Sequence, residues 1–584
     1  MATKSIKKQY IFMFSIFVLY FLRLIHIDAD VISYALNQIN PIDEMYYNEV
    51  AINIYNQGFI DSLRYGVGEV TIPNAKTYLL PNILTGLCLR VFGKTYLGLR
   101  FSSVVWGLVG LIFLYIILNL VLKHNSASKM YILFGVLLYL FDFNVLMLTR
   151  SAITIIPCMV AELIILYFYL RFRDDCYKKS FVLAFGSLTA FCIVYMGVPF
   201  FILAAFLITC RNLIVNKDKQ ERIKSFWGYI AGNVCAFIVT EIMALIFVRE
   251  HIWKVVLATF SGFSYKIAES VDILSRLAVW KNTALEFWTS NMFRYSPIML
   301  CMFALSLVLF FLKKREEFDY VALLFVLSHW AQTIVLENAT ASKATISYGM
   351  ILVYCIYSLS KIELLNWGQR AKWILCGGLV CILILVARIV AFSYKESASI
   401  FSNNEINTFI VATYVIGVVI IGAFVFWKKR SFFLSLSMAI AVLINMIFSF
   451  KYVYGHCTYS DKEACMQLAA IVGEDQIIGG FPLGFSLYNE CEIGIGAYER
   501  YTEHGMDVEY VNKLYKSCIE GSEDLYFIGH ISGFNGGCVT IDEINQDILK
   551  DSPYYFKEIY LFERNYYAYT PGDNYYILYK KVIK

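Results

Sequence analysis

The sequence predicts an all-α, polytopic membrane protein of about thirteen transmembrane helices, with a small extracytoplasmic α/β domain at its C-terminus. Of its 584 residues, 59% are hydrophobic and only 16% are charged, which is more apolar surface than a soluble protein of this size can bury. Apolar stretches of roughly 20 residues, the length that crosses the core of a bilayer, recur along the chain. From Lys451 onward the composition becomes polar and acidic, which predicts a separate domain.

The first apolar stretch runs from Tyr10 to Ile27 and follows Lys4, Lys7 and Lys8. It is too long for the core of a signal peptide, and no small-residue cleavage site follows it, so we expect it to be retained. We expect spans near 10–27, 99–122, 130–148, 152–171, 181–196, 198–214, 226–248, 296–312, 320–336, 345–360, 371–391, 406–427 and 432–450.

Every second connection between these spans is basic. The basic connections are Lys123 to Lys129, Arg171 to Lys179, Arg211 to Lys224, Lys313 to Arg315, Lys361 to Lys372 and Lys428 to Arg430. Because basic residues in short loops mark the cytoplasmic side, the N-terminus is expected in the cytoplasm, and an odd number of spans puts the C-terminus outside. The plasma membrane is expected, since no retention signal stands at Lys581 to Lys584.

Two domains follow from this topology. Residues 1–450 form the membrane domain, with large outer loops at 28–98 and 249–295, and residues 451–584 form the extracytoplasmic domain. The second part contains 20 acidic and 11 basic residues, a net charge of about −9, whereas the whole chain carries +5. A helical stretch from Ser460 to Val472, short apolar runs and punctuating glycines predict an α/β fold there. The apolar runs are Gln476 to Gly480, Asp524 to Ile528 and Asn574 to Tyr579.

Several functions and sites lack support. The sequence has no Walker loop and no GxGxxG match, and nothing in it favours nucleic-acid binding. It has no CxxC spacing and no two histidines at helical spacing, which argues against a zinc site. Five cysteines fall in the polar part, an odd number that excludes complete intramolecular pairing and leaves one or two bridges open. They are Cys457, Cys465, Cys491, Cys518 and Cys538.

The most informative feature is Asp43-Glu44, just beyond the first span. Pro41 suits the start of a short amphipathic helix and Gly58 its end. Acidic residues at a helix N-terminus gain roughly 0.3–1 kcal/mol from the helix dipole, so a purely structural role is one interpretation. The other is general-base or metal-assisted chemistry on a lipid-borne substrate at the membrane face.

From Tyr10 to about Phe172 the chain resembles the GT-C superfamily of integral-membrane glycosyltransferases, and within it the protein O-mannosyltransferase and aminoarabinose-transferase group. The matching features are a basic-flanked first span, an outer loop with the acidic pair, and the outer turn Leu148-Thr149-Arg150-Ser151-Ala152. Between them lie the polar stretch Thr71 to Tyr78, a short helix that ends at Val91-Phe92-Gly93, and the start of the next span at Leu97 to Arg100.

The resemblance implies a reaction in which a sugar moves from a polyprenyl-phosphate or dolichyl-phosphate carrier to an acceptor on the outer face. Asp43 matches the family's outer-loop catalytic aspartate, and as a base it would deprotonate the acceptor hydroxyl. Glu44 either shapes the site or helps to bind a divalent cation, Mg²⁺ or Mn²⁺, with no cofactor certain. Tyr46 and Tyr47 are expected to contact substrate. The acceptor is a protein, a glycan or a lipid, and membrane lipids are the remaining partners.

A phosphate leaving group calls for positive charge at the membrane surface. Lys76, from the loop alignment, and Lys343, in a short outer turn, are the candidates that the resemblance favours. Arg150 stands at the lip of a span, where a charge must be paired or snorkel, so phosphate binding and snorkelling are both open. The chain departs from relatives at Thr77-Tyr78, where a proline pair is common, and after Arg150, where an acidic residue is common and the next acid is Glu162.

Other functions remain open. A transporter or lipid flippase would need many intramembrane charges and often an internal repeat. Glu162, Glu241 and Asp142 are the clearest such charges, and no repeat is evident. A lipid-linked oligosaccharide polymerase or ligase would also have large outer loops, and a catalytically inactive scaffold is a further alternative.

Overall fold

The structure is a computed structural model, which describes a large part of the chain. The described residues are 14–30, 44, 48, 51–52, 54–55, 64–67, 70–73, 78–123, 128–257, 273–286, 297–335, 341–362, 368, 373, 377–378, 380, 384, 430–455, 457–473, 477–480, 487–488, 507–530, 541–563 and 575–584.

Helices lie at the expected spans wherever the structure describes them. They are a helix over Phe14–Leu24, α4 (Tyr96–Val121), α5 (Ser128–Phe141) with α6 (Phe143–Leu148), α7 (Ile155–Arg171), α8 (Cys176–Thr189) continued by η2 (Ala190–Val194), α9 (Phe200–Val215), α10 (Lys219–Phe247), α13 (Pro297–Leu312), α14 (Glu317–Val335), α16 (Tyr348–Lys361) and α19 (Arg430–Ser449). The spans expected at 371–391 and 406–427 lie almost wholly outside the described residues.

Five of the described helices are each long and apolar enough to cross a membrane: α4, α8 with η2, α10, α14 and α19. The span expected at 130–148 is divided instead. The Asp142 carboxylate accepts hydrogen bonds from the backbone N–H groups of Asn144 (3.0 Å) and Val145 (3.2 Å), so it ends α5 and caps α6. The chain is a multi-pass membrane protein, while the total of thirteen spans stays a prediction.

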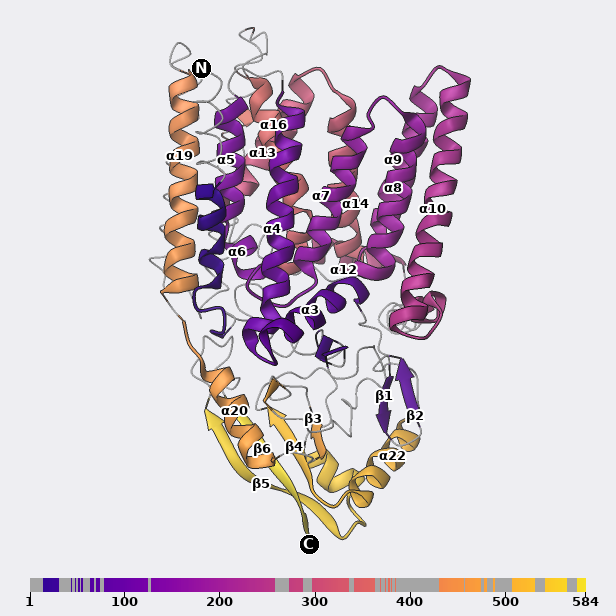
Figure 1. Cartoon of the computed structure of the whole chain (residues 1–584), viewed down its shortest axis with the longest axis vertical. Helices are drawn as coiled ribbons and strands as arrows, with labels where there is room; N and C mark the ends of the chain where they lie inside the picture. The colour runs from indigo at the N-terminus through magenta and orange to yellow at the C-terminus, as the bar shows by residue number, and fades with distance from the viewer. Residues whose placement is uncertain are drawn as a thin grey trace.

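The helices stand side by side in a bundle, and the C-terminal domain lies at one end of it (Figure 1). Helix α19 packs on α5, although the two are far apart in sequence, and α8, α9 and α10 form the opposite edge of the bundle. Beneath α4 lies α3 (Leu79–Phe92), the short apolar helix that the sequence predicts. It ends at Gly93, whose φ of 76° favours glycine.

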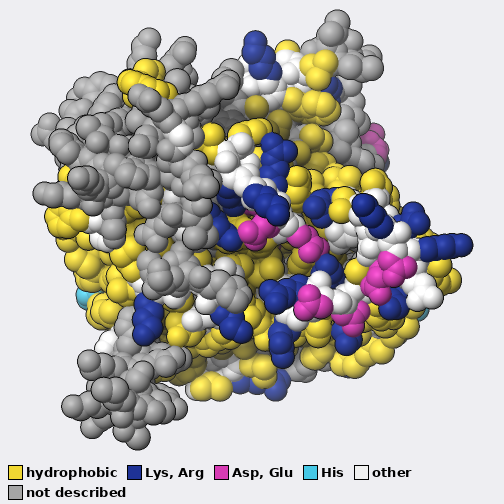
Figure 2. Space-filling view, turned by 90° about the horizontal axis from the view of Figure 1, so that it is seen from above, with side chains coloured by type: hydrophobic (Ala, Val, Ile, Leu, Met, Phe, Trp, Pro, Cys, Tyr) yellow, Lys and Arg dark blue, Asp and Glu magenta, His cyan; other side chains and the backbone are white. Residues whose placement is uncertain are grey.

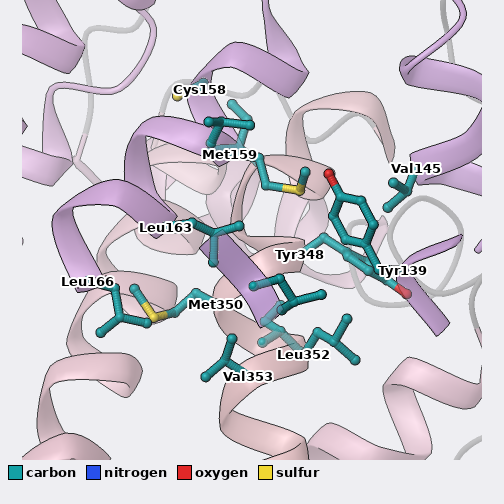
Figure 3. Close-up of a cluster of buried hydrophobic side chains, with 14 of the residues drawn as sticks. Tyr139, Val145, Cys158, Met159, Leu163, Leu166, Tyr348, Met350, Leu352 and Val353 are labelled. Carbon is teal, nitrogen blue, oxygen red and sulfur yellow. The ribbon is translucent and has the colours of Figure 1, made fainter. Parts of the chain in front are cut away.

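A buried cluster joins α5, α7 and α16, where Tyr139, Leu163 and Met350 lie together (Figure 3). The Tyr139 hydroxyl donates a hydrogen bond of 2.9 Å to the carbonyl of Gly107 in α4. A Cβ at Gly349 would lie 3.0 Å from Leu163, so this glycine lets α16 approach α7 closely. Close packing of this kind holds helices together in lipid, where burial of apolar surface supplies little driving force.

Small residues also join α8 to α10. A Cβ at Gly228 or Gly232 would overlap the backbone oxygens of Tyr177 and Phe181 on α8. The opposite face of α10 exposes large apolar side chains such as Trp227 (58%), which suits contact with lipid. Helix α10 therefore has one face for α8 and one face for the membrane.

Charged residues gather on the end of the bundle that lies opposite the C-terminal domain (Figure 2). Three ion pairs there connect neighbouring helices: Lys179 with Glu317 (2.9 Å), Lys361 with Glu316 (2.9 Å), and the buried pair Lys313 with Asp319 (2.6 Å). Two of the basic connections predicted for the cytoplasm, Arg171 to Lys179 and Arg211 to Lys224, are fully described, and both lie at this same end. That this end faces the cytoplasm stays a prediction.

The C-terminal domain contains a mixed sheet in the order β3-β4-β6-β5. Strand β3 (Ile477–Gly480) is parallel to β4 (Leu525–His530), while β6 (Tyr575–Ile583) is antiparallel to both β4 and β5 (Tyr554–Glu563). Helix α20 (Ser460–Val472) packs on one face through a cluster of Leu468, Tyr526 and Leu578. The predicted helix and the three predicted apolar strands are confirmed.

The second helix of this domain, α22 (Val508–Gly521), is tied to β6 because the Lys581 ammonium donates a hydrogen bond of 2.9 Å to the Ile519 carbonyl. Strand β1 (Arg64–Val67) contacts α22 and pairs with β2 (Val70–Pro73) in an antiparallel hairpin that the sequence analysis did not anticipate. The sequence signal for this hairpin is Gly68-Glu69 between Val67 and Val70, because glycine at the first position suits a two-residue hairpin turn.

Two further expectations can be compared with the structure. The outer loop expected at 249–295 contains two helical stretches, residues 252–257 and α12 (Ile273–Glu286). Cys457 and Cys465 are both free thiols. The side chains of Cys491, Cys518 and Cys538 lie outside the described residues.

The α8–α10 contact predicts the effect of a larger residue at Gly228. Gly228→Leu forces the helices apart, and overpacking of this kind lowers the free energy of unfolding by about 1–3 kcal/mol. The thermal unfolding midpoint in detergent should fall accordingly. Val234→Leu, on the lipid face of the same helix where Val234 is 53% exposed, is the matched control and should leave the midpoint unchanged. Equal midpoints for both variants would refute the close contact.

Candidate active site

Glu44, the second residue of the acidic pair, forms a buried ion pair with Arg100 of α4. Arg100 donates from Nε to Oε1 (2.8 Å) and from Nη2 to Oε2 (2.7 Å), so the contact is bidentate. Both side chains are almost fully buried, at 1% exposure for Glu44 and 4% for Arg100. The backbone N–H of Ala152 donates a third hydrogen bond of 2.7 Å to Oε1. The Glu44 carboxylate is therefore held on both oxygens.

Asn48, one turn after Glu44, strengthens the same contact. Its side-chain amide donates to the Glu44 carbonyl (2.6 Å) and to the Ala152 carbonyl. The backbone N–H of Ala152 thus binds Glu44, and its carbonyl binds Asn48. Ala51 and Ile52 continue this helix and pack against Leu89 and Leu99. The turn that the resemblance singled out, 148–152, is therefore the surface on which the helix of Glu44 rests.

Arg100 also holds the loop that follows the first apolar helix. Its Nη1 donates to the carbonyls of Ile27 (2.7 Å) and Ala29 (2.5 Å), and its guanidinium lies over the Tyr96 ring at 4.7 Å. One arginine consequently joins α4, the Glu44 helix and residues 27–29. A buried guanidinium needs this many acceptors, because each unsatisfied donor would lose its hydration without compensation.

Arg150 is buried beside the same loop. Its Nη2 donates a hydrogen bond of 2.6 Å to the His26 carbonyl, and its guanidinium lies 4.8 Å from the centre of the Tyr454 ring. Its Nη1 has no hydrogen-bond partner among the residues that the structure describes. At 8% exposure, Arg150 does not snorkel freely but is partly paired inside the protein.

The outer side of this loop contacts the C-terminal domain. Asp28 forms an ion pair of 2.5 Å with Lys462. The Asp30 carboxylate accepts hydrogen bonds of 2.9 Å from the hydroxyls of Thr458 and Ser460. Burial opposes ionisation of Asp28, but the hydrogen bond and charge of Lys462 outweigh it, so the pKa of Asp28 lies below its usual value.

The structure places some of the predicted site residues and not others. Asp43, Tyr46, Tyr47 and Lys76 lie outside the described residues. Glu44 and Arg150 meet at the turn 148–152, because Glu44 binds the backbone N–H of Ala152, two residues after Arg150. Lys343 is half-buried in α15 (Ala341–Ala344), and the following η4 (Thr345–Ser347) packs on α7, so Lys343 lies on a different element from Glu44 and Arg150.

Three residues near the site were not predicted from the sequence as functional candidates: Arg23, Arg100 and Asn48. Arg23 is 1% exposed and donates to the Thr149 hydroxyl (2.9 Å) and to the Leu140 carbonyl (3.0 Å). Both arginines lie in or at the edge of an apolar span, where a charge is expensive and usually has a specific partner. By this rule the sequence alone marks Arg23 and Arg100 as residues with specific partners, but it does not say which residues those partners are.

Glu44 does not fit a metal site. Its two oxygens already accept hydrogen bonds from Arg100 and Ala152, and the guanidinium brings positive charge to where a cation would bind. Among the described residues, no group of three or more His, Cys, Asp or Glu side chains could hold a metal ion. Of the two roles expected for Glu44, the geometry favours shaping the site.

Removal of Arg100 is expected to destabilise the protein. Arg100→Met leaves the Glu44 carboxylate buried and unpaired, and breaking a buried pair in this way lowers the free energy of unfolding by about 3–5 kcal/mol. Denaturant titration in detergent measures the loss. Arg173→Met is the control, because Arg173 and Asp174 are 70% and 92% exposed and such pairs contribute little. A loss below about 1 kcal/mol for Arg100→Met would contradict the ion pair.

The depressed pKa of Asp28 predicts a pH dependence. A carboxyl whose folded pKa is lowered stabilises the fold above its unfolded pKa, about 3.9, and this stabilisation is lost as pH falls through the folded pKa. The difference in unfolding midpoint between wild type and Asp28→Asn should stay constant from about pH 8 to 5 and shrink below about pH 4. A difference that already disappears near pH 6 would assign the effect to a histidine instead.

Comparison with known proteins agrees with this architecture. The family model described as "Dolichyl-phosphate-mannose-protein mannosyltransferase" matches residues 77–244. The crystal structure of ArnT from Cupriavidus metallidurans in the apo state is similar at a TM-score of 0.52 and 12% identity, over 99% of this chain and 98% of that one. The structure of the same ArnT bound to undecaprenyl phosphate gives 0.47 at 12% identity, over 98% of each chain. No curated protein matches the sequence closely enough to count as a relative.

The chain resembles the protein O-mannosyltransferase and aminoarabinose-transferase group of GT-C membrane glycosyltransferases. The resemblance is in sequence over residues 77–244 and in fold over nearly the whole length of the chain.

Proposed function

We propose that this chain is a membrane glycosyltransferase that moves a sugar from a polyprenyl-phosphate donor to an acceptor on the extracytoplasmic face. The observation that carries the proposal is the bidentate Glu44–Arg100 pair, which fixes one member of an outer-loop acidic pair at the end of the bundle next to the C-terminal domain. The matching family, whose description names dolichyl-phosphate-mannose and protein, supports both the donor class and the reaction.

The acidic pair divides into two roles in this proposal. Glu44 has both oxygens bound and cannot take a proton without weakening its contact to Arg100. Asp43 is the catalytic base: it takes the proton of the acceptor hydroxyl as the hydroxyl oxygen attacks the anomeric carbon. The bond from that carbon to the carrier phosphate breaks, and the phosphate leaves with the electron pair. Inversion in one step needs no nucleophilic carboxylate.

Positive charge for the departing phosphate comes from Arg150, Lys343 and Lys76 in this proposal. Arg150 has the best support, because its Nη1 is buried and has no partner among the described residues, while Nη2 fixes the guanidinium to the loop. A phosphate oxygen is the acceptor that a guanidinium suits best. Tyr46 and Tyr47, close to Asp43 in sequence, are proposed to contact the sugar.

Transport is the less favoured function. Two of the three intramembrane carboxylates named from the sequence have structural partners: Asp142 caps α6, and Glu241 binds the ring of His251 (2.5 Å) and the backbone N–H of Ile252 (2.8 Å). Only Glu162, with 0% exposure and no hydrogen-bond partner among the described residues, has the character of a transport residue. A single such group is a weak basis for an ion or lipid path.

The test is sugar transfer by the purified protein with a panel of polyprenyl-phosphate sugars. Asp43→Asn should lower the rate by about 10²–10⁴-fold, the usual contribution of a general base, with the unfolding midpoint unchanged. Released polyprenyl phosphate and glycosylated acceptor are both measured. Asp551→Asn, at an exposed carboxylate of the C-terminal domain, is the matched control. Full activity of Asp43→Asn would discard Asp43 as the base. Donor-stimulated lipid movement in liposomes without any transfer would favour a flippase.

A further inference from the structure

The C-terminal domain contacts the loop at residues 25–30 from outside, while the site arginines hold it from inside. The inner contacts use backbone carbonyls: His26 binds Arg150, and Ile27 and Ala29 bind Arg100. The outer contacts use the side chains of His26, Asp28 and Asp30, together with the Asp30 backbone N–H. The loop therefore contacts both the membrane domain and the C-terminal domain.

The outer contacts form a continuous set, which we call the clasp. Lys462 binds Asp28, and the hydroxyls of Thr458 and Ser460 bind Asp30. The Asp30 backbone N–H also donates to the Thr458 carbonyl (2.8 Å), and the Tyr459 hydroxyl lies 2.6 Å from Nδ1 of His26. All the C-terminal partners fall within five residues, at the start of helix α20.

His26 itself adopts a conformation that needs such support. Its φ of 52° lies in the left-handed region, which is unfavourable for a residue with a Cβ by roughly 1–2 kcal/mol. Arg150 holds its carbonyl and Tyr459 holds its ring. A residue in this conformation persists only where the surroundings fix it, and both partners are supplied from outside the loop.

A second contact joins the C-terminal domain to the helix of Glu44. Leu487 is 3% exposed and belongs to the same apolar cluster as Ala51, Ile52 and Leu89. The ring of Tyr488 lies 6.5 Å from that of Tyr96, the residue over which Arg100 lies. The clasp and this apolar contact come from separate parts of the C-terminal domain.

We propose that the C-terminal domain is a positioning part of the active site, in which Lys462 holds loop 25–30 and Leu487 holds the helix of Glu44. Both act through Arg100: the loop supplies two of its carbonyl acceptors, and the helix supplies its carboxylate. Loss of either contact lets the Glu44 helix, and with it the acidic pair, move relative to α4. The catalytic part of this inference rests on the proposed glycosyl transfer.

The experiment compares Lys462→Met, Leu487→Ala and Lys462→Arg in the full chain. Lys462→Met and Leu487→Ala should lower kcat about ten- to a hundredfold, as small misplacements of catalytic groups do, with little change in the KM for the donor. Lys462→Arg keeps the charge and should stay near wild type. Lys513→Ala is the matched control, because Lys513 pairs with Glu509 on the exposed face of α22, within the same domain, and should change nothing.

Amide hydrogen exchange in the same variants is the second readout, and it needs no turnover. Peptides that cover residues 25–30 and residues 51–52 should exchange faster in Lys462→Met and in Leu487→Ala, but not in Lys513→Ala. Unchanged exchange in both peptides overturns the proposal. Faster exchange with wild-type kcat overturns the positioning role and leaves the contact merely structural.

If the wild type transfers no sugar from any donor, the proposed function fails, and the exchange data alone decide whether the C-terminal domain positions the Glu44 helix. Faster exchange at residues 51–52 would then still support the proposal, and unchanged exchange would overturn it.

Discussion

The buried pair of Glu44 and Arg100 is the interaction on which the end of the bundle next to the C-terminal domain depends. The Arg100 side chain is only 4% exposed, so its N–H groups must donate to hydrogen-bond acceptors within the protein. It finds them in a carboxylate from the outer helix and in two carbonyls from loop 25–30. The charge therefore determines where the outer helix and the loop meet.

Two further buried arginines also donate hydrogen bonds to backbone carbonyls near the end of the first helix. Arg23 binds the carbonyl of Leu140 and the hydroxyl of Thr149, and Arg150 binds the carbonyl of His26. Backbone that leaves a helix at membrane depth exposes carbonyls that lipid cannot satisfy, so it must be buried in protein and hydrogen-bonded there. Arginine, with five donors in a planar fork, can serve several such groups at once. The end of the bundle next to the C-terminal domain is thus stabilised by hydrogen bonds from buried arginines to backbone outside regular helices.

Local sequence predicted the helices well, because apolar length and basic connections are properties of short segments. It also placed the end of α3 at Gly93 and the helix and three strands of the C-terminal domain. The partner of Glu44 could not be predicted in this way, since Arg100 is 56 residues distant and pairs through the fold alone. The break at Asp142 was missed because its neighbours keep the apolar run continuous, although an aspartate there is a capping signal. Asp43, the residue that the resemblance favours most, stays a prediction.

The ion pair of Glu44 with Arg100 also limits which carboxylate can act as the catalytic base. If Glu44 were the base, protonation would remove the charge that Arg100 needs, and a guanidinium at 4% exposure would be left facing a neutral acid at each turnover. Losing one partner of a buried pair costs about 3–5 kcal/mol, which is comparable to the whole benefit of a general base. Such a residue is better suited to hold a site than to react in it. The reacting carboxylate must then be one that no cation holds in the ground state, and the adjacent Asp43 is the candidate that the sequence offers.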